Sequence, residues 1–237
     1  MELKSQEQLK RDVALAAVGY IRPFFGPEAV IGVGTGSTAD LFIDELAKYR
    51  KEFAGAVASS ERSAARLREQ GVRVLDLSET NKPLPVYVDG ADEINPLLQM
   101  VKGGGGAHTR EKIVAAASDR FVCIVDETKC VDLLGEFAIP LEVIPMAVPV
   151  VMRKIAALGA TATLRAGFTT DNGNPILDVA GMRLADAREM ETTMNAIAGV
   201  VTCGLFALEP ATAVMVAKQQ GVDIRENECH IPDIERS

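Results

Sequence analysis

The stretch AVIGVGTGSTADLFIDELAKYR, residues 29–50, carries the pattern on which the fold prediction rests. A short apolar run, residues 29–33, ends among glycines, and apolar side chains then recur at helical spacing from Leu41 to Ala47. Ser37 or a neighbouring threonine can cap this helix at its N-terminus. The stretch therefore predicts a buried strand, a glycine turn and an amphipathic helix.

The same alternation of strand and helix recurs through the first half of the chain. Helices are expected at residues 4–22, 63–70 and about 109–118, and strands at residues 54–58, 72–77, 86–88 and 121–125. Alternation of this kind is typical of a parallel sheet with helices on both faces, so we expect an α/β fold.

The order of elements changes after residue 126. Strands are expected at residues 141–144, 161–165, 176–179 and 200–205, and helices at 149–158 and 186–197. The resulting order βαββαβ, with an Asn-Gly turn at residues 172–173, is typical of a ferredoxin-like α+β unit. We therefore expect a smaller domain at residues 131–205 and a larger domain made of residues 1–130 and 206–237. A further helix is expected at residues 209–221.

Composition excludes several classes of function. The chain has 237 residues with 33 acidic and 25 basic side chains, a net charge of −8, so a nucleic-acid partner is not expected. No apolar run is long enough to span a membrane, and the first residues lack the features of a secretory signal. The four cysteines form no C-x-x-C pair, which favours a reducing cytoplasm. Cys229 and His230 are adjacent, but with one other histidine in the chain no metal site is expected.

The glycine turn at residues 32–38 is a candidate phosphate site. Glycines let the backbone approach a ligand, and the start of a helix offers free N–H groups to an anion. The dinucleotide fingerprint fails because its third glycine is replaced by Ser37, and the P-loop fails because no Gly-Lys-Ser/Thr triplet occurs. A turn that only packs helix on strand would need the glycines, but it would not explain the hydroxyls of Thr35, Ser37 and Thr38. These favour a small phosphate monoester.

The segment VYVDGADE, residues 86–93, places carboxylates at the carboxyl end of a predicted central strand, where α/β sheets bind ligands. Asp89 and Asp92 can project into a common pocket, where repulsion and burial raise a pKa. They can also bind a hard cation such as Mg²⁺, although the lysine that follows favours an anionic guest. Glu93 can simply face solvent.

The segment KGGGGAHTREK, residues 102–112, runs through four glycines into a helix expected to be capped by Thr109. Such a run is costly in backbone entropy, which favours a role in ligand binding. Glu111 in the first turn would have its pKa lowered below about 4.3 by the helix dipole, whereas a general base works best near the operating pH. A base role therefore requires Glu111 to lose solvent when substrate fills the pocket. His108 is expected to be a solvated loop residue.

These motifs, together with LEVIPMA, TDNGNPILDV and GVVTCGLFA further along, closely resemble the type A ribose-5-phosphate isomerases. The resemblance covers most of the chain. It implies interconversion of ribose 5-phosphate and ribulose 5-phosphate in the pentose phosphate pathway, without cofactor or metal, by a homodimer or homotetramer. It also implies a Rossmann-like main domain with a ferredoxin-like lid. Gly106 and His108 depart from the family pattern, in which alanine and an apolar residue are usual.

The resemblance further implies which residues act on the substrate. Glu111 matches the acceptor that moves a proton between C2 and C1 through an enediolate. We expect Lys102 to stabilise the developing oxyanion and Asp89 to handle the hydroxyl and ring oxygens as an acid. The residues expected to contact substrate are Lys10, Thr35, Gly36, Ser37, Thr38, Asp89, Gly90, Ala91, Asp92, Lys102, Gly103, Gly104, Gly105 and Lys129, with Lys10 and Lys129 at the phosphate.

Two alternatives stay open at this point. The same fold class hosts sugar-phosphate sensors without catalysis, and related folds transfer acyl groups from coenzyme A through a glutamate nucleophile. Retention of both Glu111 and Lys102 disfavours the sensor, and the hydroxyl-rich turn fits a phosphosugar better than coenzyme A.

Overall fold

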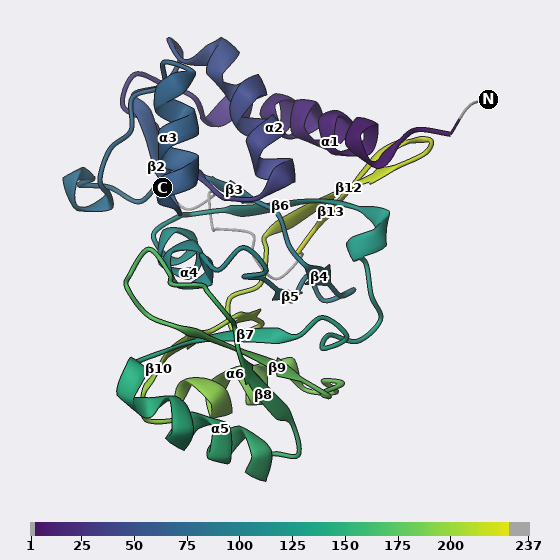
Figure 1. Cartoon of the computed structure of the whole chain (residues 1–237). Coiled ribbons are helices and arrows are strands. Elements are labelled where there is room, and N and C mark those ends of the chain that lie inside the picture. The colour runs from purple at the N-terminus through teal and green to yellow at the C-terminus, as the bar shows by residue number, and fades with distance from the viewer. Residues whose placement is uncertain (1–2, 228–237) are drawn as a thin grey trace, which may run out of the picture.

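A computed structural model describes residues 3–227 and contains a twisted main sheet with the strand order β13-β12-β6-β3-β1-β2 (Figure 1). The pairs among β12, β6, β3, β1 and β2 are parallel, and β13 adds an antiparallel edge. The strands are β1 Val30–Val33, β2 Gly55–Ala58, β3 Tyr87–Asp89, β6 Phe121–Asp126, β12 Ala213–Lys218 and β13 Gly221–Glu226. The parallel sheet expected from the sequence is therefore confirmed.

Helices cover both faces of the main sheet, as expected. The helices of this part are α1 Gln6–Ile21, α2 Ser37–Leu46, α3 Glu61–Glu69 and α4 His108–Ala116. Ile31, Val88 and Ile124 pack with α1 and α2 on one face, whereas Tyr87 and Val125 point to the other face, where α4 lies. Strands buried on both faces explain why these segments read as continuous apolar runs.

A second sheet, with the order β10-β7-β9-β8, is antiparallel throughout. Its elements are β7 Ile139–Val143, α5 Val148–Ala157, β8 Thr161–Leu164, β9 Ile176–Ala180, α6 Ala187–Asn195 and β10 Val200–Cys203. The order βαββαβ confirms the ferredoxin-like arrangement, and we call residues 139–203 the ferredoxin-like unit. Leu141 and Val143 pack into its core with α5 and α6, so the intervening Glu142 points to the opposite face.

Smaller elements complete the described chain. A small sheet of β4, β5 and β11 joins the two larger parts, and β11 pairs with β5. These elements are β4 Glu93–Ile94, β5 Met100–Val101 and β11 Leu205–Phe206, with 3-10 turns η1 Arg22–Phe24, η2 Ala47–Tyr49, η3 Leu77–Glu79, η4 Glu127–Lys129 and η5 Pro145–Ala147. Within residues 3–227, no helix is both long and apolar enough to cross a membrane.

Two predicted elements differ from the structure. The helix expected at residues 209–221 is wrong, because Ala213–Lys218 forms β12 beside β6. Val214 and Val216 pack in one core while Met215 and Ala217 pack in the other, a period of two that two-sided burial favours over intrinsic helix propensity. The strand expected at residues 72–77 is reduced to one bridge between Val74 and Ala56.

Candidate active site

A pocket of about 360 Å³ lies at the carboxyl ends of β1 and β3. The glycine turn, the acidic segment and the glycine-rich loop, which lie apart in the sequence, all line it. The predicted residues among its lining are Lys10, Thr35, Gly36, Ser37, Thr38, Gly90, Ala91, Asp92, Lys102, Gly103, Gly104, Gly105, Glu111 and Lys129. Of the predicted set, Asp89 alone is not part of the lining.

One end of the pocket is formed by the start of α2. Gly36 is the residue before the helix, at φ +109°, a conformation that glycine adopts without strain. The expected side-chain cap is wrong, because no side chain caps this helix and Ser37 is its first residue. The Ser37 Oγ atom instead accepts a hydrogen bond from Lys10 Nζ at 3.0 Å. Helix N–H groups, hydroxyls and a cation therefore meet at a place suited to a phosphate.

The other end of the pocket holds a buried group of three charged residues, Asp89, Lys102 and Glu111. Their exposed fractions are 0%, 2% and 3%. Lys102 Nζ lies 2.7 Å from Asp89 Oδ2 and 3.3 Å from Glu111 Oε2. Strand β3 ends at Asp89, Lys102 directly follows β5, and Glu111 lies in the first turn of α4. Three elements thus bring two carboxylates and one ammonium group together.

Asp89 is the innermost member of this group. Its Oδ1 atom accepts hydrogen bonds from the backbone N–H groups of Thr35 and Gly90, and its Oδ2 atom accepts from Tyr87 Oη and from Lys102. A Cβ atom at residue 34 would lie 1.9 Å from this carboxyl group, so Gly34 is needed for the close approach. Asp89 therefore lies behind the pocket lining and fixes the Lys102 ammonium group through an ion pair.

Burial changes the protonation of Glu111. Loss of solvent raises its pKa to about 8, and the repulsion of Asp89 adds to this, although the Lys102 ammonium opposes the rise. The expectation of a lowered pKa is therefore wrong, because burial outweighs the helix dipole. The protein itself shields the carboxyl group from solvent, and its pKa lies near the operating pH of a general base.

Lys102 stays charged in this buried position. Burial by itself lowers its pKa, but Asp89 and Glu111 reverse this and raise the pKa above its ordinary value. Its Nζ atom also donates to the carbonyl oxygen of Gly90 and lies 5.5 Å from the centre of the Phe206 ring. A fixed cation therefore faces the pocket beside Glu111.

The glycine-rich loop is shaped by Asp92, whose Oδ2 atom accepts a hydrogen bond from the Gly104 backbone N–H at 2.8 Å. Asp92 also lines the pocket, and a Cβ atom at residue 104 would lie 2.7 Å from its Oδ1 atom, so a glycine is needed for the close approach. The loop thus lies close against the acidic segment, as expected from the sequence.

The start of α4 differs from the prediction in two respects. Ala107, not Thr109, precedes the helix, and no side chain caps it. His108 is fully buried, not solvated, and its Nε2 atom accepts a hydrogen bond from the backbone N–H of Glu142 at 3.1 Å. Burial lowers the pKa of His108 to about 4, so the ring is neutral. The ring is buried because the start of α4 packs against β7 and β10 of the ferredoxin-like unit.

Part of the pocket was not anticipated. Phe168, Thr169 and Asp171, from the loop between β8 and β9, reach it from the ferredoxin-like unit, and further contributions come from Gln6, Ser60, Arg62, Gly106 and Ala107. The Asn-Gly pair at residues 172–173 predicts a hairpin turn but does not indicate that this loop lines a pocket. The connection between β8 and β9, from residue 165 to residue 175, is longer than a two-residue hairpin turn, and long connections often contribute to functional sites.

No metal cluster is evident in the described chain. Among residues 3–227, no group of three or more histidine, cysteine or acidic side chains is arranged to hold a metal ion. Cys229 and His230 lie outside the described residues.

Comparison with known proteins agrees with this geometry. The family model for ribose 5-phosphate isomerase A (phosphoriboisomerase A) matches residues 55–221. The ribose-5-phosphate isomerase A of Bordetella petrii is 59% identical over 218 residues, which cover 92% of this chain and 96% of that protein.

Solved structures give the same result. The crystal structure of ribose 5 phosphate isomerase A from Neisseria gonorrhoeae has a TM-score of 0.91 at 42% identity, covering 95% of this chain and 99% of that one. A D-ribose-5-phosphate isomerase in complex with phospho-erythronic acid has a TM-score of 0.86 at 35% identity, covering 95% and 100%. The chain therefore belongs to the ribose 5-phosphate isomerase A family.

Proposed function

We propose that this protein interconverts D-ribose 5-phosphate and D-ribulose 5-phosphate through an enediolate, in the non-oxidative branch of the pentose phosphate pathway. The observation that carries the proposal is the pairing of Glu111 with Lys102 at 3.3 Å in a pocket whose other end is the start of α2. A carboxylate can remove the carbon-bound proton, and the neighbouring ammonium group can stabilise the enediolate oxygen. Neither step requires a metal or a cofactor.

The three charged residues receive different roles. Glu111 moves the proton between C2 and C1, and Lys102 faces the sugar oxygens. Asp89 was expected to act on the hydroxyl and ring oxygens directly, but it lies beneath Lys102 and outside the pocket lining. We therefore assign Asp89 to fixing Lys102, and assign the sugar hydroxyls to Asp92.

The phosphate group is assigned to the start of α2, with Ser37, Thr38, Lys10 and Lys129 around it. The analogue phospho-erythronic acid, held by a structural relative, likewise combines a phosphate with an acidic, hydroxylated chain. That chemistry suits a site with helix N–H groups at one end and an ammonium group at the other.

Replacing Thr38 by valine should raise KM for ribose 5-phosphate by about 10- to 100-fold, because a hydrogen bond to a charged phosphate is lost. The effect on kcat should be smaller, since the phosphate is far from the reacting carbons. Steady-state kinetics measure both, with Thr192→Val on the exposed side of α6 as the matched control. An unchanged KM would place the phosphate elsewhere.

The pH dependence of activity follows from Glu111. Only the deprotonated carboxylate accepts a proton, and its pKa is raised to about 8, so kcat/KM should increase with pH up to about 8 and then level off. The phosphate of the substrate titrates near pH 6 and contributes little above pH 7. A profile that stays flat between pH 6.5 and 8 would contradict the assignment.

Purified protein incubated with ribose 5-phosphate in the presence of a chelator tests the proposed function. Formation of ketose supports it. Binding of the phosphosugar without ketose would favour a sensor. A covalent glutamyl thioester, detected by mass spectrometry after incubation with acyl coenzyme A, would favour acyl transfer.

We also propose a homodimer or homotetramer located in the cytoplasm. Apolar side chains of the ferredoxin-like unit are exposed, with Met146 at 86%, followed by Ile144, Leu164 and Val201. Cys123, Cys130 and Cys203 carry free thiols, as in a reducing compartment. Light scattering coupled to size-exclusion chromatography measures the assembly, and a monomer would contradict this proposal.

The division into domains is also proposed. Residues 131–205 would form the lid and assembly domain, and residues 1–130 and 206–237 the Rossmann-like domain. This division keeps β12 with the main sheet. The chain passes from the larger domain to the smaller one just after η4, and it returns within β11. Residues 228–237 lie outside the described part.

A further inference from the structure

The first turn of α4 is held by the ferredoxin-like unit. His108 bonds to the backbone of β7, Thr109 to the side chain of Glu142, and Arg110 to the loop between β8 and β9. The next residue, Glu111, points the other way and lies 3.3 Å from Lys102. Three consecutive anchors thus precede the carboxyl group to which we assign proton transfer.

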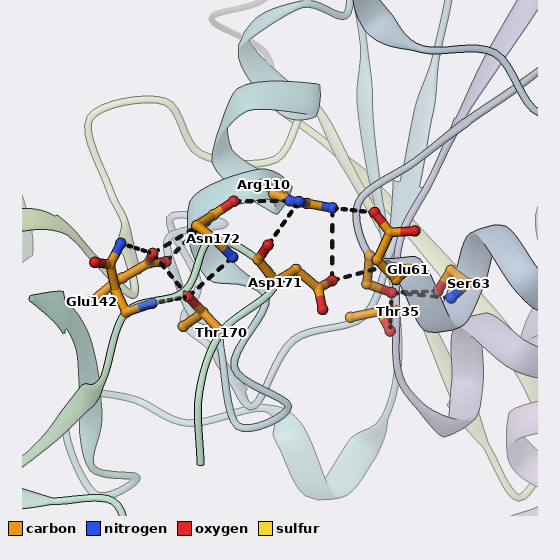
Figure 2. A network of polar contacts seen from close by, with 10 residues as sticks. Thr35, Glu61, Ser63, Arg110, Glu142, Thr170, Asp171 and Asn172 are labelled. Carbon is orange, nitrogen blue, oxygen red and sulfur yellow. Dashed lines mark hydrogen bonds and ion pairs between the residues drawn. The ribbon is translucent and has the colours of Figure 1, made fainter.

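The Glu142 carboxylate bonds to Thr109 and to the 170–174 turn, and Figure 2 shows its contacts with Thr170 and Asn172. Its Oε2 atom accepts a hydrogen bond from Thr109 Oγ1 at 2.5 Å. Its Oε1 atom accepts from Thr170 Oγ1 at 3.0 Å and from Asn174 Nδ2 at 2.8 Å, and Asn172 Nδ2 lies 3.2 Å from both oxygens. The side chain is 0% exposed. One carboxylate therefore joins the start of α4 to both ends of the 170–174 turn.

The Glu142 carboxylate keeps its charge although, within residues 3–227, its hydrogen-bond donors are hydroxyl and amide groups and not cations. Burial raises the pKa of its carboxyl group, but the hydrogen bonds from Thr109, Asn174, Asn172 and Thr170 outweigh burial and lower it. A buried carboxylate contributes little net stability compared with an apolar group of similar size. Its geometric effect is larger, because charge-assisted hydrogen bonds fix the directions of every donor around it.

Arg110 extends the same network to the start of α3. Its guanidinium group donates to Asn172 Oδ1 at 2.9 Å, to the Asp171 carbonyl oxygen at 3.0 Å and to Glu61 Oε1 at 2.8 Å. The Asp171 carboxylate in turn accepts from the Glu61 backbone N–H at 2.9 Å. Figure 2 shows the continuous line from Glu142 through Arg110 to Glu61. The loop that carries Phe168 and Asp171 over the pocket is thereby tied to α3 as well as to α4.

We infer that Glu142 is a positioning residue for the isomerisation: it fixes the first turn of α4, and with it Glu111, against the 168–174 loop that closes the pocket. The inference rests on the proposed function. Glu142 does not line the pocket to which we assign the substrate. It acts by keeping the Glu111 carboxyl group aligned with Lys102 and shielded from water.

The variant Glu142→Gln tests this inference, with Glu189→Gln on the exposed surface of α6 as the matched control. In either orientation, a glutamine of the same shape places its NH₂ group against the Asn172 amide donor, which lies 3.2 Å from both oxygens of Glu142, so the turn must rearrange. We expect kcat to fall by about 10- to 100-fold, the range for a misplaced reacting group, with a smaller change in KM. Solvent admitted to Glu111 should also move the rise of kcat/KM to lower pH.

The variant Thr109→Val gives an independent test, since it removes one hydroxyl donor from Glu142 and leaves the shape of the helix intact. Thr109→Val should show a smaller fall in kcat and a smaller shift of the kcat/KM rise to lower pH. If Glu142→Gln does not fold, Thr109→Val tests the inference alone. A loss of thermal stability with unchanged kcat and an unmoved pH profile in the folded variants would overturn the inference. An inactive wild-type protein would instead refute the proposed function, so the two failures are distinguishable.

Discussion

Replacing Glu111 by glutamine is expected to lower kcat by about 10²–10⁴-fold, the contribution of a positioned general base. KM should change little, because the missing group acts mainly in the transition state. Glutamine keeps the size of the side chain but has no basic oxygen, so the C2 proton of ribose 5-phosphate should no longer exchange with deuterium from the solvent. Proton NMR in D₂O measures this exchange separately from turnover.

The stability of the same variant should be preserved. The pKa of Glu111 is raised to about 8 in the folded protein and is lower in the unfolded chain. Ionisation of Glu111 therefore lowers the free energy of unfolding, and this loss grows as the pH rises from the pKa of the unfolded chain to that of the folded protein. Neutral glutamine removes this penalty, and Tm should be unchanged or higher at pH 8 to 9. Glu69→Gln, exposed at the end of α3, is the matched control. Loss of affinity equal to the loss of kcat would contradict the assignment of Glu111 as the base.

The sequence predicted most of the pocket because its chemistry lies in contiguous segments. Glycines, hydroxyls and carboxylates at the ends of apolar strands indicate which edge of the sheet binds ligand. Thr35 and Asp92 accordingly meet in the pocket although they lie far apart in the chain. Asp89 lies in the same segment, but its depth below the pocket depends on the close approach of Gly34, which only the folded backbone brings beside it.

What the sequence could not predict depends on contacts between the two parts of the fold. His108 is buried where β7 lies against the start of α4, and the raised pKa of Glu111 arises from its burial beside Asp89. No sequence pattern around residue 108 indicates that other elements bury this side chain. The same limit applies to β12, whose helix-favouring composition is overridden by burial on both faces of the sheet.

Replacing Lys102 by methionine should affect activity and stability together. The enediolate loses its cation, and kcat/KM should fall by about 10²–10³-fold, as for removal of a donor from an oxyanion site. Asp89 and Glu111 are then left buried without their ammonium partner, which should lower the free energy of unfolding by about 3–5 kcal/mol. Kinetics and urea denaturation measure the two losses, with Lys82→Met on the exposed surface as the control.

The pH profile and a double variant separate the two roles of Lys102. Because Lys102 lowers the pKa of Glu111, its removal should shift the rise of residual activity to higher pH, opposite to the shift expected for Glu142→Gln. Adding Asp89→Asn removes the nearest unpaired carboxylate, so the double variant should regain much of the lost stability while its activity stays low. If instead the double variant recovered activity in step with stability, Lys102 would act only as the counter-ion of Asp89, and the oxyanion would need another donor.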